Sequence, residues 1–319
     1  MGDSFLDIRK WLDERKLIGV KLGLTNCEIM LQRLNNPHLE FPSIHVAGTN
    51  GKGSLCVQLS ATACANNLKV GLFTSPHLIT IEERIRINGV PISPVDFDKF
   101  LNIIRDASLI SPVCNPTFFE VTFLLAMLAF RENEIDRAII ETGLGGRLDS
   151  TRLVDADLCV ITTISKDHTE FLGNTLEEIA FEKAGIHRPG VPFILSKNKN
   201  LSHSVVKIIS DKVGSDIIIH ETSDSSSPWE IWSKLSNEIA KLFGWNIPML
   251  ECSWPGRSPG YGSLWFEVDT KICAAHNKEG FIAELNSINR PCVIVIGVTE
   301  KADIEAVSYT HLTLPTTGV

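Results

Sequence analysis

Residues 43–54 read Ser-Ile-His-Val-Ala-Gly-Thr-Asn-Gly-Lys-Gly-Ser and constrain the fold more than any other part of the chain. A short apolar, partly β-branched run leads into a glycine-rich turn, and a helix-like pattern follows. Glycines let a backbone approach an anion closely, while successive N–H groups and the start of a helix supply positive potential. The segment therefore predicts a strand, a phosphate-binding loop and a helix, with Lys52 reaching the β- and γ-phosphates and Ser54 available to Mg²⁺.

The glycine spacing fits the common phosphate-loop pattern only in part. Two residues separate Gly48 from Gly51, and Gly53 lies between Lys52 and Ser54. Taken alone, the segment is also compatible with an ordinary glycine-rich turn. The rest of the chain has to decide between the two interpretations.

Composition narrows the class of protein. The 319 residues allow two domains of ordinary size, and 44% hydrophobic with 21% charged residues is typical of a globular protein. The net charge of −8 argues against nucleic acid as the main partner. Eight scattered cysteines without a CxxC pair indicate reduced thiols and a cytoplasmic setting. Residues 1–17 lack the apolar core of a signal peptide, and the apolar run 118–130 is too short to span a bilayer, so we expect no membrane role.

Short apolar strands alternate with helical patterns along most of the chain. This alternation predicts an α/β fold, with a parallel sheet covered by helices on both faces. Ligands of such folds bind at the carboxyl ends of the strands. The expected strands are Ile44–Ala47, Val70–Thr74, Arg137–Glu141, Leu158–Thr162, Phe193–Leu195 and Asp216–His220; the expected helices are 55–67, 97–107, 118–131, 175–184, 203–212 and 229–243. The charged segment 82–89 is expected to be a loop with a β-turn.

A second, smaller unit is expected after the turn at Trp254–Arg257. It combines a strand pattern at 264–273, a helix after Asn277 and a buried-strand pattern at 292–297. The threonine-rich end continues no periodic element and indicates a non-native or disordered tail. We therefore expect an ATP-binding domain at 1–250, a partial carboxyl-terminal domain at 251–307 and a tail at 308–319.

Three polar side chains occupy positions where a bound phosphate or metal would explain them. Glu141 ends an apolar strand, where it is either a surface carboxylate or a Mg²⁺ ligand. Ser75 follows the second strand, in what is otherwise a simple Ser-Pro turn. Lys183 falls on the inward face of its expected helix, so that it either extends its ammonium group to water or meets a phosphate, metal or carbamate.

Ten strings in a consistent order resemble the folylpolyglutamate synthase/dihydrofolate synthase family of the Mur ligase superfamily. They are KLGL (21–24), HVAGTNGKGS (45–54), FTSPHL (73–78), ERIRINGVPIS (83–93), TFFEVTFLLAM (117–127), ETGLGGRLDST (141–151), DHTEFLG (167–173), EKAGI (182–186), WPGR (254–257) and AHN (275–277). The resemblance implies a central Mur ligase domain with a phosphate loop and a smaller, Rossmann-like carboxyl-terminal domain that is cut short here.

The resemblance also implies an activity and a set of site residues. Such enzymes use ATP to phosphorylate the terminal carboxylate of a folate or dihydropteroate, and the amine of L-glutamate then attacks the acyl phosphate. Family members are commonly monomeric, so a monomer is expected. Carried over, Glu141, His168 and Lys183 are catalytic; Ser54, Ser75 and Glu141 hold one Mg²⁺ and His168 a second; and Lys183 matches a lysine that is carbamylated in the family. The nucleotide would be bound by Gly48, Thr49, Asn50, Gly51, Lys52, Gly53, Ser54, Arg257 and His276.

Two positions depart from the family's pattern. Cys273 stands where the family has an aspartate that contacts the nucleotide, and Arg152 replaces an asparagine. A cysteine cannot accept two ribose hydrogen bonds as a carboxylate can, and the carboxyl-terminal domain stops before its family length. We therefore expect weakened ATP affinity or an inactive fragment.

Several readings of the function stay open at this stage. The favoured one is an ATP-dependent folate–glutamate ligase, acting on folylpolyglutamate alone or also on dihydropteroate. The alternatives are a ligase for another carboxylate, a binding protein for nucleotide or folate without turnover, and a phosphate-loop kinase, which would need neither Lys183 nor His168.

Overall fold

The computed structural model describes residues 2–222, 227–248, 252–254, 256–257 and 277–286. The chain divides into two compact units. The first comprises Met1–Thr222 and Trp232–Cys252, and the second comprises Ser223–Ile231 and Ser253–Val319. In the second unit, α10 (Lys278–Asn286) follows Asn277, as the sequence predicts, and Asn277 Oδ1 accepts a hydrogen bond from the N–H of Gly280.

The first unit is built on an eight-stranded sheet in the order β4-β3-β2-β5-β1-β6-β7-β8. Six strands from β2 to β8 in this order run parallel, and β3 and β4 add an antiparallel hairpin beside β2. The strands are β1 Ser43–Ala47, β2 Val70–Phe73, β3 Ile85–Ile87, β4 Val90–Pro91, β5 Arg137–Glu141, β6 Ala156–Ile161, β7 Phe193–Lys197 and β8 Ile217–Glu221. Because β1 lies between β5 and β6, the loops that follow these three strands meet at one edge of the sheet.

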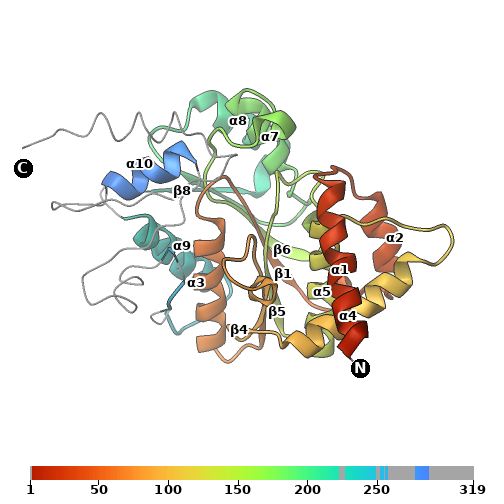
Figure 1. Cartoon of the computed structure of the whole chain (residues 1–319). Helices are drawn as coiled ribbons and strands as arrows, with labels where there is room; N and C mark the ends of the chain where they lie inside the picture. Colours follow the sequence, from red (N-terminus) through yellow and green to blue (C-terminus); the bar gives the residue numbers. More distant parts are fainter. Residues whose placement is uncertain (1, 223–226, 249–251, 255, 258–276, 287–319) are drawn as a thin grey trace, which may run out of the picture. The chain divides into compact units, whose positions relative to one another are not determined.

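Helices cover both faces of this sheet. Their bounds are α1 Gly2–Glu14, α2 Thr25–Arg33, α3 Lys52–Ala65, α4 Pro94–Ser108, α5 Phe118–Glu132, α6 Thr169–Leu172, α7 Leu176–Ala184, α8 His203–Val213 and α9 Pro228–Leu242, with short 3₁₀ turns at Arg15–Ile18, Pro37–Leu39, Ile81–Arg84, Ser150–Leu153 and Gly214–Asp216. Figure 1 shows α3 and α9 on one side of the sheet and α1, α2, α4 and α5 on the other. None of the helices in the described part of the chain is long and apolar enough to cross a membrane.

Alternation along the strands explains the two-sided packing. Successive side chains of a strand point to opposite faces of a sheet. On β5, Ile140 joins the core formed with α5, whereas its neighbour Ile139 is equally buried on the other face, where α3 contacts β5. The central strands β1, β2, β5 and β6 are therefore buried on both faces, which is typical of a parallel sheet that is covered by helices on both sides.

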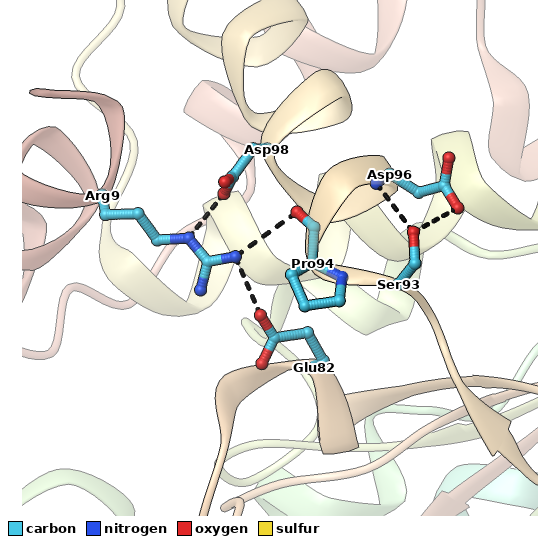
Figure 2. Close-up of polar contacts among 6 residues, drawn as sticks. All are labelled: Arg9, Glu82, Ser93, Pro94, Asp96 and Asp98. Carbon is cyan, nitrogen blue, oxygen red and sulfur yellow. Dashed lines mark hydrogen bonds and ion pairs between the residues drawn. The ribbon is translucent and has the colours of Figure 1, made fainter. Parts of the chain in front are cut away.

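The amino-terminal helix is held to this unit by a cluster of charges (Figure 2). The guanidinium group of Arg9 in α1 pairs with Oε1 of Glu82 at 2.8 Å and with the carboxylate of Asp98 in α4. Ser93 caps α4 by accepting a hydrogen bond from the N–H of Asp96 at 3.0 Å. Side chains from three separate segments thus fix α1 beside the turn that follows β2.

The predicted α/β fold with a central parallel sheet is confirmed, and all six expected strands are present within two residues of their predicted bounds. The charged segment 82–89 was expected to be a loop, and this is wrong in part, because Ile85–Ile87 pairs antiparallel with β2. Its alternating Arg and Ile residues form a strand too short to show a clear period. The strand patterns at 264–273 and 292–297 and the tail at 308–319 lie outside the described residues, and the domain limits at 250 and 307 stay predictions.

Candidate active site

The phosphate-loop candidate leaves β1 at Gly48 and enters α3 at Lys52. A Cβ atom on Gly48 would lie 1.9 Å from Oγ1 of Thr162, so the close approach of β1 and β6 requires glycine here. Gly51 is the residue before α3 and has a φ of +86°, a conformation that glycine adopts without strain. The strand, loop and helix predicted from residues 43–54 are confirmed, and α3 starts at the lysine.

Two lysine side chains converge on this loop. The ammonium group of Lys52 donates to the carbonyl oxygens of Gly48 at 3.1 Å and Thr49 at 3.2 Å. Nζ of Lys183, from the last turn of α7, donates to the same Gly48 oxygen at 2.9 Å. The sequence left open whether Lys183 extends to water, and the structure decides against it, because the residue is only 4% exposed.

The environment of Lys183 disfavours its charged form. Burial lowers the pKa of Lys183 from 10.5 to about 7, and the positive charge of Lys52 acts in the same direction, whereas Asp167 and Asp149 oppose the shift. A large part of the Lys183 side chains is therefore neutral at neutral pH, which makes the amine a nucleophile.

Glu141 lies at the carboxyl end of β5, beside the loop after β2. It is 4% exposed, and its Oε2 accepts a hydrogen bond from the N–H of Ser75 at 3.1 Å. The buried guanidinium of Arg84 interacts electrostatically with the carboxylate of Glu141. Burial lowers the pKa of Arg84 to about 10, and the charge of Glu141 opposes that shift. The structure thus brings together Glu141 and Ser75, two of the predicted metal ligands.

The predicted metal ligands provide hard oxygen donors. The Glu141 carboxylate and the hydroxyls of Ser54 and Ser75 are groups that Mg²⁺ prefers, and Ser54 is 6% exposed at the start of α3. Within the described residues, no group of three or more His, Cys, Asp or Glu side chains forms a metal-binding cluster. The predicted set contains one carboxylate, from Glu141, and two serine hydroxyls, and these oxygen donors fit one Mg²⁺.

His168 is more exposed than Glu141 and Ser54. It adopts a left-handed conformation with φ of +49° at the start of α6, its side chain is 50% exposed, and its Nε2 lies 3.8 Å from Asp167. A second metal position at His168 stays a prediction. Arg257 belongs to the second unit, and His276 and Cys273 lie outside the described residues, so their roles toward a nucleotide also stay predictions.

A buried chain of hydrogen bonds holds the glycine-rich loop after β5, and sequence reasoning missed it. Asp149 accepts hydrogen bonds from the N–H of Leu144 at 2.8 Å and from the hydroxyl of Thr151. Nε2 of His45 lies 2.9 Å from Oγ1 of Thr151, and Nδ1 of His45 lies 3.4 Å from a guanidinium nitrogen of Arg188. Since Arg188 can only donate, Nδ1 accepts and the proton resides on Nε2.

Charge and burial keep that histidine neutral. Burial lowers the pKa of His45 well below its ordinary value, and the guanidinium groups of Arg188 and Arg152 lower it further. The neutral imidazole therefore links Arg188 to Thr151 and Asp149 across β1. A histidine in an apolar strand gives no sequence signal for this role, because its partners are distant in the chain.

Arg152 has a structural function here. Its Nε donates to the carbonyl of Gly185 at 2.8 Å, and Nη2 donates to the carbonyl of His187 at 3.0 Å. Both carbonyls lie just after α7, where a cation also interacts favourably with the helix dipole. Arg152 thereby ties the end of the Lys183 helix to the loop after β5.

Known proteins are similar to this chain in sequence and fold. The family model of the Mur ligase middle domain matches residues 46–227. The dihydrofolate synthase/folylpolyglutamate synthase of Bacillus subtilis is 38% identical over 72% of this chain and 52% of its own length. The folylpolyglutamate synthase of Mycobacterium tuberculosis superposes with a TM-score of 0.75, at 26% identity over 89% of this chain and 73% of that one.

A solved bifunctional folylpolyglutamate synthase/dihydrofolate synthase with Mn, AMPPNP and L-glutamate bound superposes with a TM-score of 0.70. It is 27% identical over 88% of this chain and 73% of its own length. The chain spans about half the length of the curated relatives it matches. With the family match covering more than half of its residues, the chain belongs to the Mur ligase family, and its similarity within that family is to the folylpolyglutamate and dihydrofolate synthases.

Proposed function

We propose that the protein is an ATP-dependent ligase that joins L-glutamate to the carboxylate of a folate. One observation carries the proposal: the ammonium groups of Lys52 and Lys183 both reach the carbonyl of Gly48, on the edge of the sheet where Glu141 is buried. A phosphate-loop kinase has no need for a second, buried lysine at this place. In the proposed ligase, Lys52 and the metal ions would neutralise the negative charge that gathers on the phosphoryl and acyl oxygens, and Lys183 would act through the carbamate described below.

In the proposed reaction, a carboxylate oxygen of the folate attacks the γ-phosphorus of ATP, and ADP leaves. The amine of L-glutamate then attacks the acyl carbon, phosphate leaves with the bonding electrons, and the amine loses a proton as the amide forms. Lys52 and the N–H groups of residues 51–54 would hold the phosphates from the start of α3, because the N–H groups of Thr49 and Asn50 already donate to Thr163. Positioning and charge neutralisation account for most of the catalysis in such transfers.

Glu141, Ser54 and Ser75 would hold Mg²⁺ beside the phosphates, and His168 would serve a second ion. A bound Mg²⁺ supplies positive charge that polarises the phosphoryl oxygens. Ser75 contributes through its backbone as well, since its N–H fixes one oxygen of Glu141.

Lys183 is proposed to carry a carbamate. Its neutral amine attacks the carbon of CO₂, an electron pair of one C=O bond moves to oxygen, and the nitrogen releases a proton, so that the neutral amine becomes an anionic carbamate. The pKa of about 7 supports this step, because the reactive form is the neutral amine. The resulting anion would compensate the charge of Lys52 next to it.

The experiment that tests the function measures ADP and phosphate release from ATP with Mg²⁺ and L-glutamate, with tetrahydrofolate or dihydropteroate added separately. We expect release that requires both glutamate and one pterin, and the active acceptor distinguishes a folylpolyglutamate synthase from a bifunctional enzyme. Release that needs neither would instead favour an ATPase or kinase. The relatives with nucleotide and glutamate bound support the choice of substrates.

A second candidate is a protein that binds nucleotide or folate without turnover. Cys273 favours it, because this residue stands where the family has the carboxylate that contacts the nucleotide. The variant Cys273→Asp separates the two candidates. Turnover that appears only in this variant would establish the impaired protein, whereas turnover in the unchanged chain would exclude it.

A further inference from the structure

The phosphate-loop candidate is held from two sides, and one of them lies far away in the sequence. On the first side, Thr162 and Thr163 at the end of β6 both donate hydroxyl hydrogen bonds to the carbonyl of Asn50, at 2.7 and 3.1 Å. The N–H of Asn50 donates to Oγ1 of Thr163 at 2.8 Å, and the N–H of Thr49 donates to the carbonyl of Thr163 at 2.8 Å. These bonds fix the first half of the loop.

On the second side, the indole of Trp232 lies against Gly51. A Cβ atom on Gly51 would be only 2.3 Å from Cε2 and Cζ2 of the indole, so the ring is in direct contact with the glycine backbone. Trp232 is 5% exposed, although it belongs to a helix with a polar outer face. This contact occurs at the residue that immediately precedes Lys52 and the N–H groups of α3.

The helix that carries Trp232 is itself anchored to α3. One turn further along α9, the hydroxyl of Ser236 lies 3.1 Å from the hydroxyl of Thr62, and both residues are fully buried. Beyond the helix, the side chain of Asn66 exchanges two hydrogen bonds with the backbone of Ile247, at 2.8 and 3.0 Å. The indole therefore has a fixed base, and its position relative to Gly51 is determined by the packing of α9 along α3.

We propose that Trp232 is a positioning residue for nucleotide binding, which holds Gly51 in its left-handed conformation so that Lys52 and the first N–H groups of α3 face the phosphates. The inference rests on the proposed function, because it assumes that this loop binds a nucleotide. A shorter side chain would leave space beside Gly51 and allow the loop to sample conformations in which its donors diverge. The effect should fall on nucleotide affinity and leave the affinity for glutamate unchanged.

The test compares the Kd of AMPPCP with Mg²⁺, measured by calorimetry on the full chain, for Trp232→Phe and Trp232→Ala. We expect Kd to rise about threefold and about tenfold, respectively. Trp245→Phe is a matched control, because Trp245 stacks on Phe243 with ring centroids 5.1 Å apart near Arg137, at the opposite end of the parallel strands. Its Kd should stay within about twofold of the wild-type value.

A second measurement distinguishes direct contact from general destabilisation. Gly51→Ala places a methyl group where the indole lies, and Trp232→Ala makes room for it, so the double variant should bind better than the two single effects predict. A purely structural role of Trp232 would lower the melting temperature and the active fraction but would leave Kd and this coupling unaffected.

The outcomes separate the two proposals. If the wild-type chain binds the nucleotide and Trp232→Phe and Trp232→Ala have the same Kd, the proposed role of Trp232 is wrong. The proposed function is not affected by that result. Trp232→Phe keeps most of the ring, so it provides this answer even where the alanine variant does not fold. A wild-type chain that binds no nucleotide refutes the phosphate-binding loop, and both proposals fail with it.

Discussion

Replacing the buried Lys183 with methionine should change how stability depends on pH. The pKa of this lysine is about 7 in the folded protein and 10.5 when the group is in water, so the unfolded chain binds more protons between these values. Stability therefore rises with pH across this window. The penalty for burying the amine is complete below pH 7 and has vanished above pH 10.5.

The magnitude follows from the size of the pKa change. A depression from 10.5 to about 7 corresponds to a penalty of about 5 kcal/mol at most, and roughly half of it is relieved between pH 6 and pH 9. Lys183→Met has no titrating group at this position. It loses the hydrogen bond to Gly48, which costs about 1 kcal/mol at every pH. Wild type should thus gain stability relative to this variant as pH rises.

The assay is urea unfolding of both proteins in CO₂-free buffer at pH 6, 7.5 and 9, because a carbamate would change the titration. Lys207→Met is the control, since Lys207 is exposed and pairs with Asp211 at 2.7 Å on the surface of α8. Free-energy differences between wild type and Lys183→Met that stay constant to within about 0.5 kcal/mol over this range would refute the reasoning. Ligase activity of Lys183→Met should be lost at all three pH values.

Three further predictions follow from other contacts. Glu141→Gln keeps the size of the side chain but removes its charge. The Mg²⁺ concentration for half-maximal activity should therefore rise, and kcat should fall about 100-fold. An unchanged Mg²⁺ dependence would exclude Glu141 as a ligand. Arg152→Asn, the family's own residue, removes the bonds to Gly185 and His187 and should lower the free energy of unfolding by about 1–2 kcal/mol, measured by urea, with no change expected if Arg152 is merely solvated. Arg9→Ala leaves Glu82 and Asp98, whose side chains are 9% and 10% exposed, without their shared cation (Figure 2), and should lower the free energy of unfolding by about 1–3 kcal/mol. Arg105→Ala, which removes the exposed pair with Asp106, is the control and should have little effect. An equal loss of stability in both variants would argue against the cluster.

The fold was predictable from the sequence wherever one local rule dominates. The central strands are short apolar runs between turns, and the helix at 175–184 begins with a Thr-Glu capping box that the structure contains at Thr175 and Glu178. The short hairpin at Ile85–Val90 was not recognised as paired strands, because alternating arginines make it polar. Its pairing depends on β2, which provides the partner edge.

The candidate site was predictable only where a residue was conspicuous in its own segment. Lys52 lies in a glycine-rich motif, and Lys183 falls on an apolar helix face, so the sequence indicates both lysines as candidates. Their shared contact with the carbonyl of Gly48 depends on the fold. Thr162 and Thr163 are ordinary β-branched residues at a strand end. Their hydroxyls become parts of the phosphate-loop candidate only through the pairing of β1 with β6.

Trp232 is the extreme case of this limit. An amphipathic helix is expected to bury a tryptophan, so the pattern of α9 gives the side chain a sufficient structural explanation and no reason to look further. Trp232 is informative because its indole occupies the space that a side chain at Gly51 would need. The positive φ of Gly51 is a second reason for glycine at this position of the loop. The sequence around Gly51 explains that glycine, and the sequence around Trp232 explains that tryptophan. Their contact is an additional explanation that only the folded structure provides. In this chain the fold alone brings Gly51 and Trp232 together, and neither residue's own segment names the other as its partner.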